Sequence, residues 1–202
     1  MTHPALQSGN VAVITGAALG IGRALAGRLA AGGMKVALLD VDEAHLEDAV
    51  GNIGENALAL PCDVSDLEAL DAARQRIEQV WGSTPSVLVN NAVTRIGRGF
   101  DADPAEWRRA FEINVMGVVN GVRTFLPGML ARDAPGVVVN VGSKQGITNP
   151  PGHPVYNMAK AAIRSYTEQL QHDLRGKQAA VTAHLLVPGW TTTGTNAHKP
   201  GA

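Results

Sequence analysis

The chain has 202 residues and a net charge of −1, and this length suits one compact domain with a substantial core. Hydrophobic residues make up 45% and charged residues 17%, with the 17 Lys and Arg side chains dispersed, so neither nucleic acid nor an anionic membrane is an expected partner. The single Cys62 excludes an internal disulfide, the scattered histidines predict no metal site, and no apolar run reaches the roughly 20 residues that span a bilayer, which together favour a cytoplasmic protein.

The first predicted strand and helix enclose a glycine-rich turn. Residues 11–14 form a continuous apolar run typical of a strand covered on both faces, and residues 24–30 have the apolar spacing of a helix. Between them lies the segment Thr15-Gly16-Ala17-Ala18-Leu19-Gly20-Ile21-Gly22. Glycines in this context let the backbone approach a pyrophosphate, while the helix N-terminus presents free N–H groups. We therefore expect dinucleotide binding in preference to a plain strand-to-helix turn.

The second predicted strand, residues 35–39, ends at Asp40, which lies 20 positions after Gly20. An acidic residue at that separation accepts hydrogen bonds from the adenosine ribose hydroxyls and repels a 2′-phosphate. Asp42 is the better cap for the next helix, residues 43–50, which leaves Asp40 free for the ribose. The alternative is that either aspartate simply caps that helix. This pattern favours NAD over NADP.

Strand and helix patterns alternate along the rest of the chain, without an internal repeat or a linker. Further strands are predicted at 57–60, 87–89, 137–141 and 181–187, and helices at about 67–80, 104–130 and 154–174. Such alternation at short connections indicates parallel βαβ units with right-handed crossovers. The predicted fold class is α/β, a doubly wound parallel sheet of the Rossmann type that forms a single domain over residues 1–202.

Each predicted strand is followed by polar or glycine-rich residues. In a doubly wound sheet the ligand lies beyond the carboxyl ends of the strands, so these segments are expected to share one edge. They are Gly16–Gly22, Asp40, Asp63-Val64, Asn90–Val93, Ser143 and Pro188-Gly189.

Tyr156 and Lys160 lie four residues apart in the last predicted helix and project from the same face, about one turn apart. A tyrosine hydroxyl is a poor proton donor or acceptor at neutral pH, and a nearby ammonium favours the ionised phenolate. The pair can therefore act as a general acid and base. On its own, the same spacing also arises from ordinary surface or core packing.

Taken together, these segments resemble the short-chain dehydrogenases/reductases. The resemblance covers residues 10 to about 193, in the order and spacing of that family. The matching segments are Thr15–Gly22, Asp63-Val64, Asn90-Asn91-Ala92, Asn114, Ser143 thirteen residues before Tyr156, Tyr156-x-x-x-Lys160 and Pro188-Gly189.

The resemblance implies a catalytic set. Tyr156 would be the general acid and base, and Lys160 would favour its ionised form and hold the nicotinamide ribose. Ser143 would hydrogen-bond the substrate oxygen, and Asn114 would hold a water that connects Lys160 to solvent. For Asn114 the alternative is a hydrogen bond to a neighbouring strand backbone. The implied reaction is NAD(P)-dependent hydride transfer between a nicotinamide cofactor and a secondary alcohol or its ketone.

The resemblance also implies cofactor-binding residues and a homodimer or homotetramer formed through the two long helices. The pyrophosphate would meet Gly16, Ala18, Leu19, Gly20, Ile21 and Gly22, the adenosine would meet Asp40, Asp63, Val64, Asn91 and Ala92, and the nicotinamide side would meet Tyr156, Lys160, Pro188, Gly189, Thr191 and Thr193.

The chain departs from the family pattern in two places. Val93 stands where the family usually has glycine, and a β-branched residue adopts positive φ only at a cost. Residues 190–202 are polar and contain Gly and Pro, where the family continues with a substrate-covering segment, a helix and a seventh strand. We therefore expect an incomplete substrate-binding segment in a trimmed chain. A catalytically silent cofactor-binding sensor or assembly subunit is the alternative function.

Overall fold

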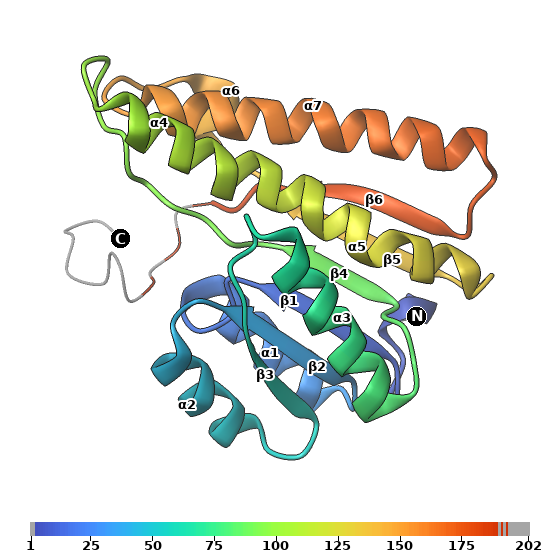
Figure 1. Ribbon diagram of the computed structural model, residues 1–202. Coiled ribbons are helices and arrows are strands. Elements are labelled where there is room, and N and C mark those ends of the chain that lie inside the picture. Colours follow the sequence, from blue (N-terminus) through green and yellow to red (C-terminus); the bar gives the residue numbers. More distant parts are fainter. Residues whose placement is uncertain (1–2, 190, 192, 194–202) are drawn as a thin grey trace.

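The computed structural model describes residues 3–189, 191 and 193, and its frame is a parallel sheet of six strands (Figure 1). The strands are β1 (Val11–Thr15), β2 (Lys35–Asp40), β3 (Ala57–Pro61), β4 (Val87–Asn90), β5 (Gly136–Val141) and β6 (Val181–Leu186). They lie in the order β3-β2-β1-β4-β5-β6, and every neighbouring pair is parallel. The strand order reverses between β1 and β4, which confirms the doubly wound prediction and places the topological switch point there.

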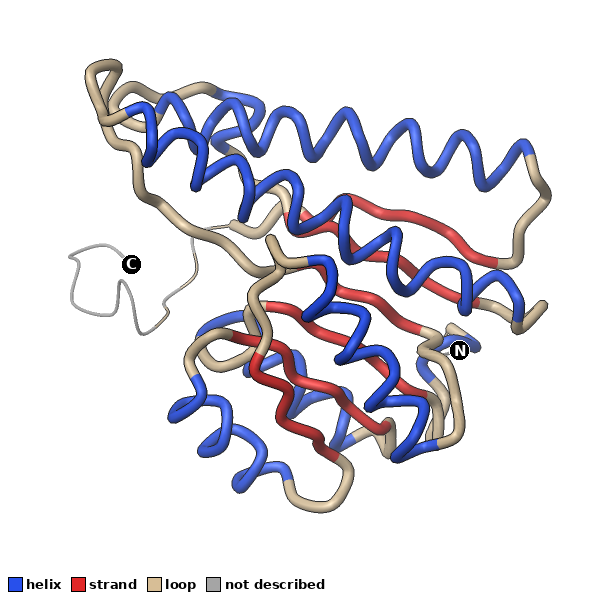
Figure 2. The backbone as a smooth tube through the Cα atoms, in the orientation of Figure 1, coloured by secondary structure: helices blue, strands red, loops and turns tan. Residues whose placement is uncertain are grey.

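Helices cover both faces of this sheet (Figure 2). Their bounds are α1 (Gly20–Ala31), α2 (Glu43–Ile53), α3 (Leu67–Trp81), α4 (Pro104–Phe111), α5 (Gly117–Ala131), α6 (Gln145–Thr148) and α7 (Pro154–Gly176), with a 3₁₀ turn at Pro4–Leu6. The helices α3, α5 and α7 pack on one face, and α1 and α2 pack on the other. No helix within the described residues is both long and apolar enough to cross a membrane.

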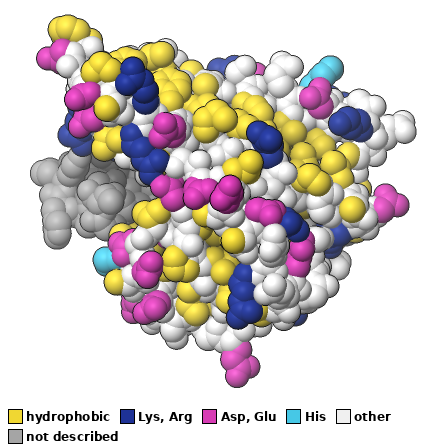
Figure 3. Space-filling view, in the orientation of Figure 1, with side chains coloured by type: hydrophobic (Ala, Val, Ile, Leu, Met, Phe, Trp, Pro, Cys, Tyr) yellow, Lys and Arg dark blue, Asp and Glu magenta, His cyan; other side chains and the backbone are white. Residues whose placement is uncertain are grey.

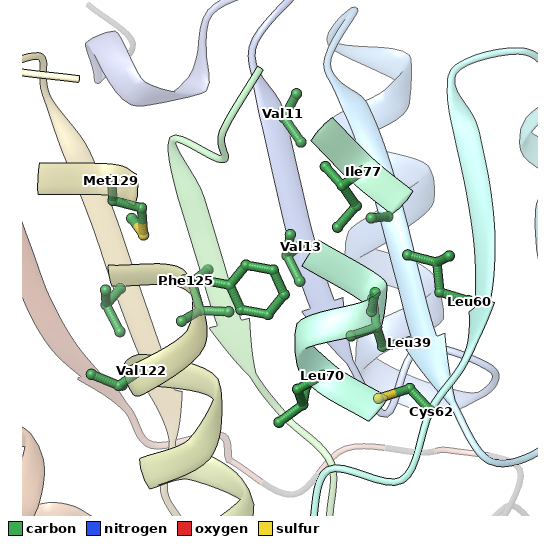
Figure 4. Packing of buried hydrophobic residues seen from close by; sticks show 14 of the residues in the cluster. Val11, Val13, Leu39, Leu60, Cys62, Leu70, Ile77, Val122, Phe125 and Met129 are labelled. Carbon is green, nitrogen blue, oxygen red and sulfur yellow. The ribbon is translucent and has the colours of Figure 1, made fainter. Parts of the chain in front are cut away.

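The sheet has two hydrophobic clusters, one on each face, because its strands are apolar on both sides. In the cluster beneath α3 and α5, the ring of Phe125 points from α5 toward β1 and lies near Val13 (Figure 4). Cys62 belongs to the same cluster, and its burial raises the pKa of the thiol to about 12. This cysteine is therefore a packing residue.

Two local features differ from the sequence prediction. The helix predicted over 104–130 contains a π-helical turn, Glu112–Met116, that separates α4 from α5. The segment between β5 and α7 contains the short helix α6, which has too few residues to show a periodic apolar pattern. The π-helical turn matters for the site because it contains Asn114.

Candidate active site

Tyr156 and Lys160 lie one turn apart in the first turns of α7, which begins at Pro154. Proline suits this position because the first helical residues have no intrahelical acceptor for their N–H groups. Both side chains are nearly buried, Tyr156 at 8% and Lys160 at 3% exposure. Lys160 Nζ lies 5.7 Å from the centre of the Tyr156 ring and donates a hydrogen bond of 2.7 Å to Val141 O, at the end of β5. The helix spacing predicted from the sequence is confirmed.

The environment of Lys160 disfavours its charged form. Burial, together with the smaller effect of the positive charge of Arg95, lowers the pKa of Lys160 to about 8. Near neutral pH the ammonium is still the major form, because the pH lies below this pKa. The residue therefore places a positive charge beside Tyr156 in a poorly solvated position.

Ser143 follows β5, two residues after Val141, and reaches the same region. Its Oγ accepts a hydrogen bond of 3.2 Å from the backbone N–H of Gln145. The next helix, α6, packs against α7 so closely that a Cβ on Gly146 would stand 2.6 Å from the carbonyl carbon of Lys160. The helix that follows Ser143 is thus packed against the turn of α7 that carries Lys160, and Ser143 lies two residues beyond Val141, whose carbonyl accepts from Lys160 Nζ.

Asn114 is 1% exposed and lies in the π-helical turn. Its Oδ1 accepts from Thr94 N at 2.8 Å, and its Nδ2 donates to Thr94 O at 2.9 Å. The side chain thus secures the segment after β4 through both of its polar atoms. This is the backbone-pairing alternative that the sequence left open, and a role of Asn114 in a water relay stays a prediction.

The glycine-rich turn is packed too closely for larger residues. A Cβ on Gly16 would lie 2.7 Å from Ala92 Cα, and one on Gly22 would lie 2.3 Å from Gly16 O. Gly16 and Gly20 also have positive φ, +64° and +58°. Asn91 Nδ2 donates to the carbonyls of Thr15 and Gly16, which ties the end of β4 to this turn. Asn91 and Ala92 were predicted to flank the ribose, and the structure places them against the turn itself.

Asp40 lies at the end of β2, and its carboxylate, which the sequence predicts to be free for a ribose, already accepts two hydrogen bonds from the backbone. Its Oδ2 accepts from Ala18 N at 3.0 Å, and its Oδ1 accepts from Asp42 N at 3.1 Å. Asp42 caps α2 through His45 N, as predicted. Each oxygen of Asp40 has more than one lone pair, so the carboxylate can accept further hydrogen bonds. The contact with Ala18 holds the negative charge against the glycine-rich turn.

Asp63 and Val64 follow β3, and Arg109, which no sequence pattern connects with them, contacts Asp63. Ser65 N and Oγ donate to Asp63 Oδ1, and the Arg109 guanidinium of α4 donates to Asp63 Oδ2 and to Ser65 Oγ. Burial opposes ionisation of Asp63, but these hydrogen bonds outweigh it and hold the pKa of the carboxyl below its usual range. Val64 is buried, and its side chain contacts the position that a Cβ on Gly117 would take.

The segment after β6 borders the other side of the glycine-rich turn. A hollow of about 450 Å³ is lined by Gly20, Ile21, Ala24, Leu25, Leu186, Pro188, Thr191 and Thr193. The methyl carbon of Thr193 lies 3.3 Å from the Cβ position of Gly20. Pro188, Thr191 and Thr193 therefore lie near the turn, and their contact with the nicotinamide side of a cofactor stays a prediction, as does that of Gly189. Most of the predicted substrate-binding segment 190–202 lies outside the described residues.

Val93 stands where the family usually has glycine, but its backbone does not adopt positive φ. Its φ is not positive, because the non-glycine residues with positive φ are Asp133, Asn149 and Gln178. The side chain is 48% exposed. Replacement of glycine by Val93 therefore introduces no backbone strain, and its consequence is the added bulk of an apolar side chain beside Ala92.

The site has the features that a dinucleotide requires and shows no arrangement for a metal. The two glycines with positive φ, the close approach at Gly22 and the hollow beside Gly20 form an open cradle at the N-terminus of α1. In the described part of the chain, no three His, Cys, Asp or Glu side chains come together as metal ligands. This cradle fits a phosphate-bearing group that approaches the backbone N–H donors of the turn.

Comparison with known proteins points to one family. A family model described as short chain dehydrogenase matches residues 10–201. The chain is 34% identical over 188 residues to the putative oxidoreductase SadH of Mycobacterium tuberculosis, which covers 92% of this chain and 68% of the relative. It is 34% identical over 189 residues to galactitol 2-dehydrogenase (L-tagatose-forming) of Cereibacter sphaeroides, and this alignment covers 92% of this chain and 72% of that protein.

Solved structures agree with the sequence comparison. A short chain dehydrogenase/reductase from Burkholderia phymatum in complex with NAD superposes with a TM-score of 0.88 at 36% identity, over 96% of this chain and 71% of that one. A 3-ketoacyl-(acyl-carrier-protein) reductase from Brucella melitensis complexed with NADH gives a TM-score of 0.81 at 32% identity, over 91% of this chain and 78% of that one.

Proposed function

The chain belongs to the short-chain dehydrogenase/reductase family, and from this premise we propose that it is an NAD-dependent enzyme that interconverts a secondary alcohol and its ketone. The observation that carries this proposal is the pair Tyr156 and Lys160, nearly buried one turn apart at the carboxyl edge of the sheet. A module that only binds a cofactor needs no buried acid and base. When bound, the nicotinamide cofactor supplies the acceptor or donor of the hydride.

The residues of this chain handle the proton and hold the reacting oxygen. Tyr156 takes the proton of the alcohol during oxidation and returns one to the carbonyl oxygen during reduction. Ser143 donates a hydrogen bond to the same oxygen and stabilises the charge that develops on it. The ammonium of Lys160, held by Val141 O, places a positive charge 5.7 Å from the centre of the Tyr156 ring. Burial of the pair strengthens this electrostatic effect.

Asp40 supports the preference for NAD over NADP. Its carboxylate stands at the end of β2 and is held against the glycine-rich turn by Ala18 N. An anion at this place accepts hydrogen bonds from ribose hydroxyls and repels a 2′-phosphate. The solved relatives from Burkholderia phymatum and Brucella melitensis contain NAD and NADH.

A homodimer or homotetramer is part of this proposal. Figure 3 shows hydrophobic side chains gathered over the face that carries α4, α5 and α7. Met116, in the π-helical turn between α4 and α5, is one of the large apolar residues that remain exposed. A second copy packed on this face would bury them. A cytoplasmic location fits the free, buried Cys62.

Replacement of the proposed acid and base tests the function. Tyr156→Phe removes only the hydroxyl, so we expect NADH to bind as to wild type while turnover falls about 10²- to 10⁴-fold. NADH fluorescence titration and a panel of secondary alcohols and ketones measure the two effects. The matched control is Tyr166→Phe, because Tyr166 is the chain's other tyrosine and lies in the same helix. Full turnover in Tyr156→Phe would refute the proposal. NADH binding without turnover in wild type would instead support the silent cofactor-binding subunit.

A further inference from the structure

A second cation faces the ring of Tyr156. The guanidinium carbon of Arg95 lies over this ring, 5.1 Å from its centre, while Lys160 Nζ lies 5.7 Å from the same centre. Arg95 comes from the segment after β4, which Asn114 secures through the backbone of the neighbouring Thr94. The hydrogen bonds between Asn114, a predicted site residue, and Thr94 therefore hold the backbone next to Arg95.

The charge of Arg95 is not neutralised by the protein around it. Arg23, Arg74 and Arg109 each form an ion pair with a carboxylate. Over residues 3–189, no carboxylate lies within ion-pair distance of Arg95 or Lys160. Together with Lys160, Arg95 gives the site an excess of positive charge.

The acidic residue that does reach this segment is already engaged. Glu106 of α4 accepts a hydrogen bond from Gly97 N through its Oε2. That contact shapes the turn two residues after Arg95 and leaves the guanidinium facing the Tyr156 ring. An arginine that contacts a buried tyrosine and has no carboxylate partner retains its N–H donors for another group.

We propose that Arg95 is a substrate-specificity residue that binds a carboxylate on the substrate, so that the substrates are hydroxy acids and the corresponding keto acids. This inference rests on the proposed function, because it places the carbinol oxygen at Tyr156 and Ser143. The guanidinium of Arg95 lies over the Tyr156 ring and has no carboxylate partner over residues 3–189, so its N–H donors are available to match a carboxylate bidentately. A carboxylate a few bonds from the carbinol carbon reaches Arg95 while the hydroxyl contacts Tyr156.

A purely structural role for Arg95 has a different consequence. If the guanidinium only packs on the ring of Tyr156, its loss disturbs that ring and changes the turnover of every substrate by the same factor. Binding of a carboxylate instead predicts a selective loss that depends on the charge of the substrate. The two roles are therefore separated by substrates that differ only in charge.

The test compares hydroxy acids with their primary amides, which have nearly the same shape and no charge. A series of 2-, 3- and 4-hydroxy acids and the matching amides is assayed with wild type, Arg95→Gln and Arg95→Lys. We expect wild type to prefer the best acid over its amide, and Arg95→Gln to lower kcat/KM for that acid about 100-fold, chiefly through KM, with the amide changed less than about threefold. Arg95→Lys should retain part of the preference because its charge remains.

Arg98→Gln is the matched control, because Arg98 is an exposed arginine three residues further along the same segment. We expect it to leave both substrates unchanged. Equal losses for acid and amide in Arg95→Gln would overturn the inference, as would a wild-type enzyme that turns over neutral alcohols and shows no preference for acids.

The proposed function and this inference fail in different ways. If wild type turns over neither a member of the series nor a neutral alcohol, the proposed function fails. Arg95 is then tested by adding butanoate or butanamide to the complex with NADH and following the fluorescence. Tighter binding of butanoate than of butanamide, lost in Arg95→Gln, supports the carboxylate site. No difference between the two ligands overturns it.

Discussion

Lys160 is a buried cation, and its charge is poorly solvated in the folded protein. Its ammonium is nearly excluded from water and donates a hydrogen bond to Val141 O, and a second cation, Arg95, lies nearby. A charged group in such a position destabilises the folded state, because water solvates it better than the protein does. The site therefore retains a positive charge at a cost in stability.

This cost predicts a dependence of stability on pH. Burial lowers the pKa of Lys160 to about 8, against 10.5 in the unfolded chain. Between these values the unfolded state binds more protons, so the free energy of unfolding rises with pH. Relative to Lys160→Met, wild type should gain about 2 kcal/mol between pH 7 and pH 9.5. Urea unfolding of both proteins at the two pH values measures the difference. Parallel changes in the two proteins would show that Lys160 does not titrate in this range.

Asp40 sets the second prediction at this scale. Loss of its charge in Asp40→Ala removes the repulsion of a 2′-phosphate and the hydrogen bonds to a ribose, so the ratio of kcat/KM for NAD to that for NADP should fall about tenfold or more. Asp42→Ala is the control, because Asp42 caps α2 two residues further on. It should weaken the helix end and leave the ratio as in wild type. An unchanged ratio in Asp40→Ala would refute the ribose assignment.

At the scale of elements, the turn between β1 and α1 depends on close approach as much as on conformation. A Cβ on Gly22 would stand 2.3 Å from Gly16 O, whereas one on Gly27, in the same helix, would meet no atom within 4 Å. Gly22 and Gly27 thus differ in packing although both lie in α1.

Substitution of these two glycines by alanine should therefore have opposite effects. Gly22→Ala forces the turn to move and should lower the free energy of unfolding by about 1–3 kcal/mol and weaken NADH binding. Gly27→Ala should raise stability by up to about 1 kcal/mol, because alanine is the better helix former and has space here. Urea unfolding and NADH titration measure both. Equal stability of the two variants would contradict the packing argument.

The π-helical turn is the other element that shapes the site. It lies between α4 and α5 and presents Asn114 to the segment after β4, whose backbone this side chain holds. A regular helix over the same residues would turn the Asn114 side chain to a different direction. The backbone next to Arg95 is thus held by an irregular turn in a helix that comes later in the chain.

At the scale of the whole molecule, stability comes from the two clusters that enclose the sheet. Phe125 lies in the cluster beneath α3 and α5 and is 1% exposed (Figure 4). Phe125→Ala should lower the free energy of unfolding by about 3–5 kcal/mol, because the cavity it leaves is enclosed by several elements. Phe100→Ala is the control, since Phe100 is 92% exposed, and should change stability by less than about 0.5 kcal/mol. Thermal and urea unfolding measure both variants, and similar midpoints would contradict the assigned core.

Much of the fold and part of the site could be predicted from the sequence. The strand and helix patterns, the cap at Asp42 and the glycine-rich turn are local, so their signals lie within a few neighbouring residues. The segments at the strand ends could be assigned to one edge of the sheet because parallel strands all end there. The four-residue spacing of Tyr156 and Lys160 likewise follows from the geometry of one helix.

The tertiary structure alone decided the contacts between these local elements. It shows that Asp40 is bonded to Ala18 N, that Asn114 holds the backbone of Thr94, and that Arg95 lies over the ring of Tyr156. No pattern of spacing connects such partners, because each comes from a separate strand end or helix and their separation in the chain carries no periodicity. The sequence by itself determined the strands, the longer helices and the kind of chemistry, and the packing of the sheet and helices determined which charges meet at the site.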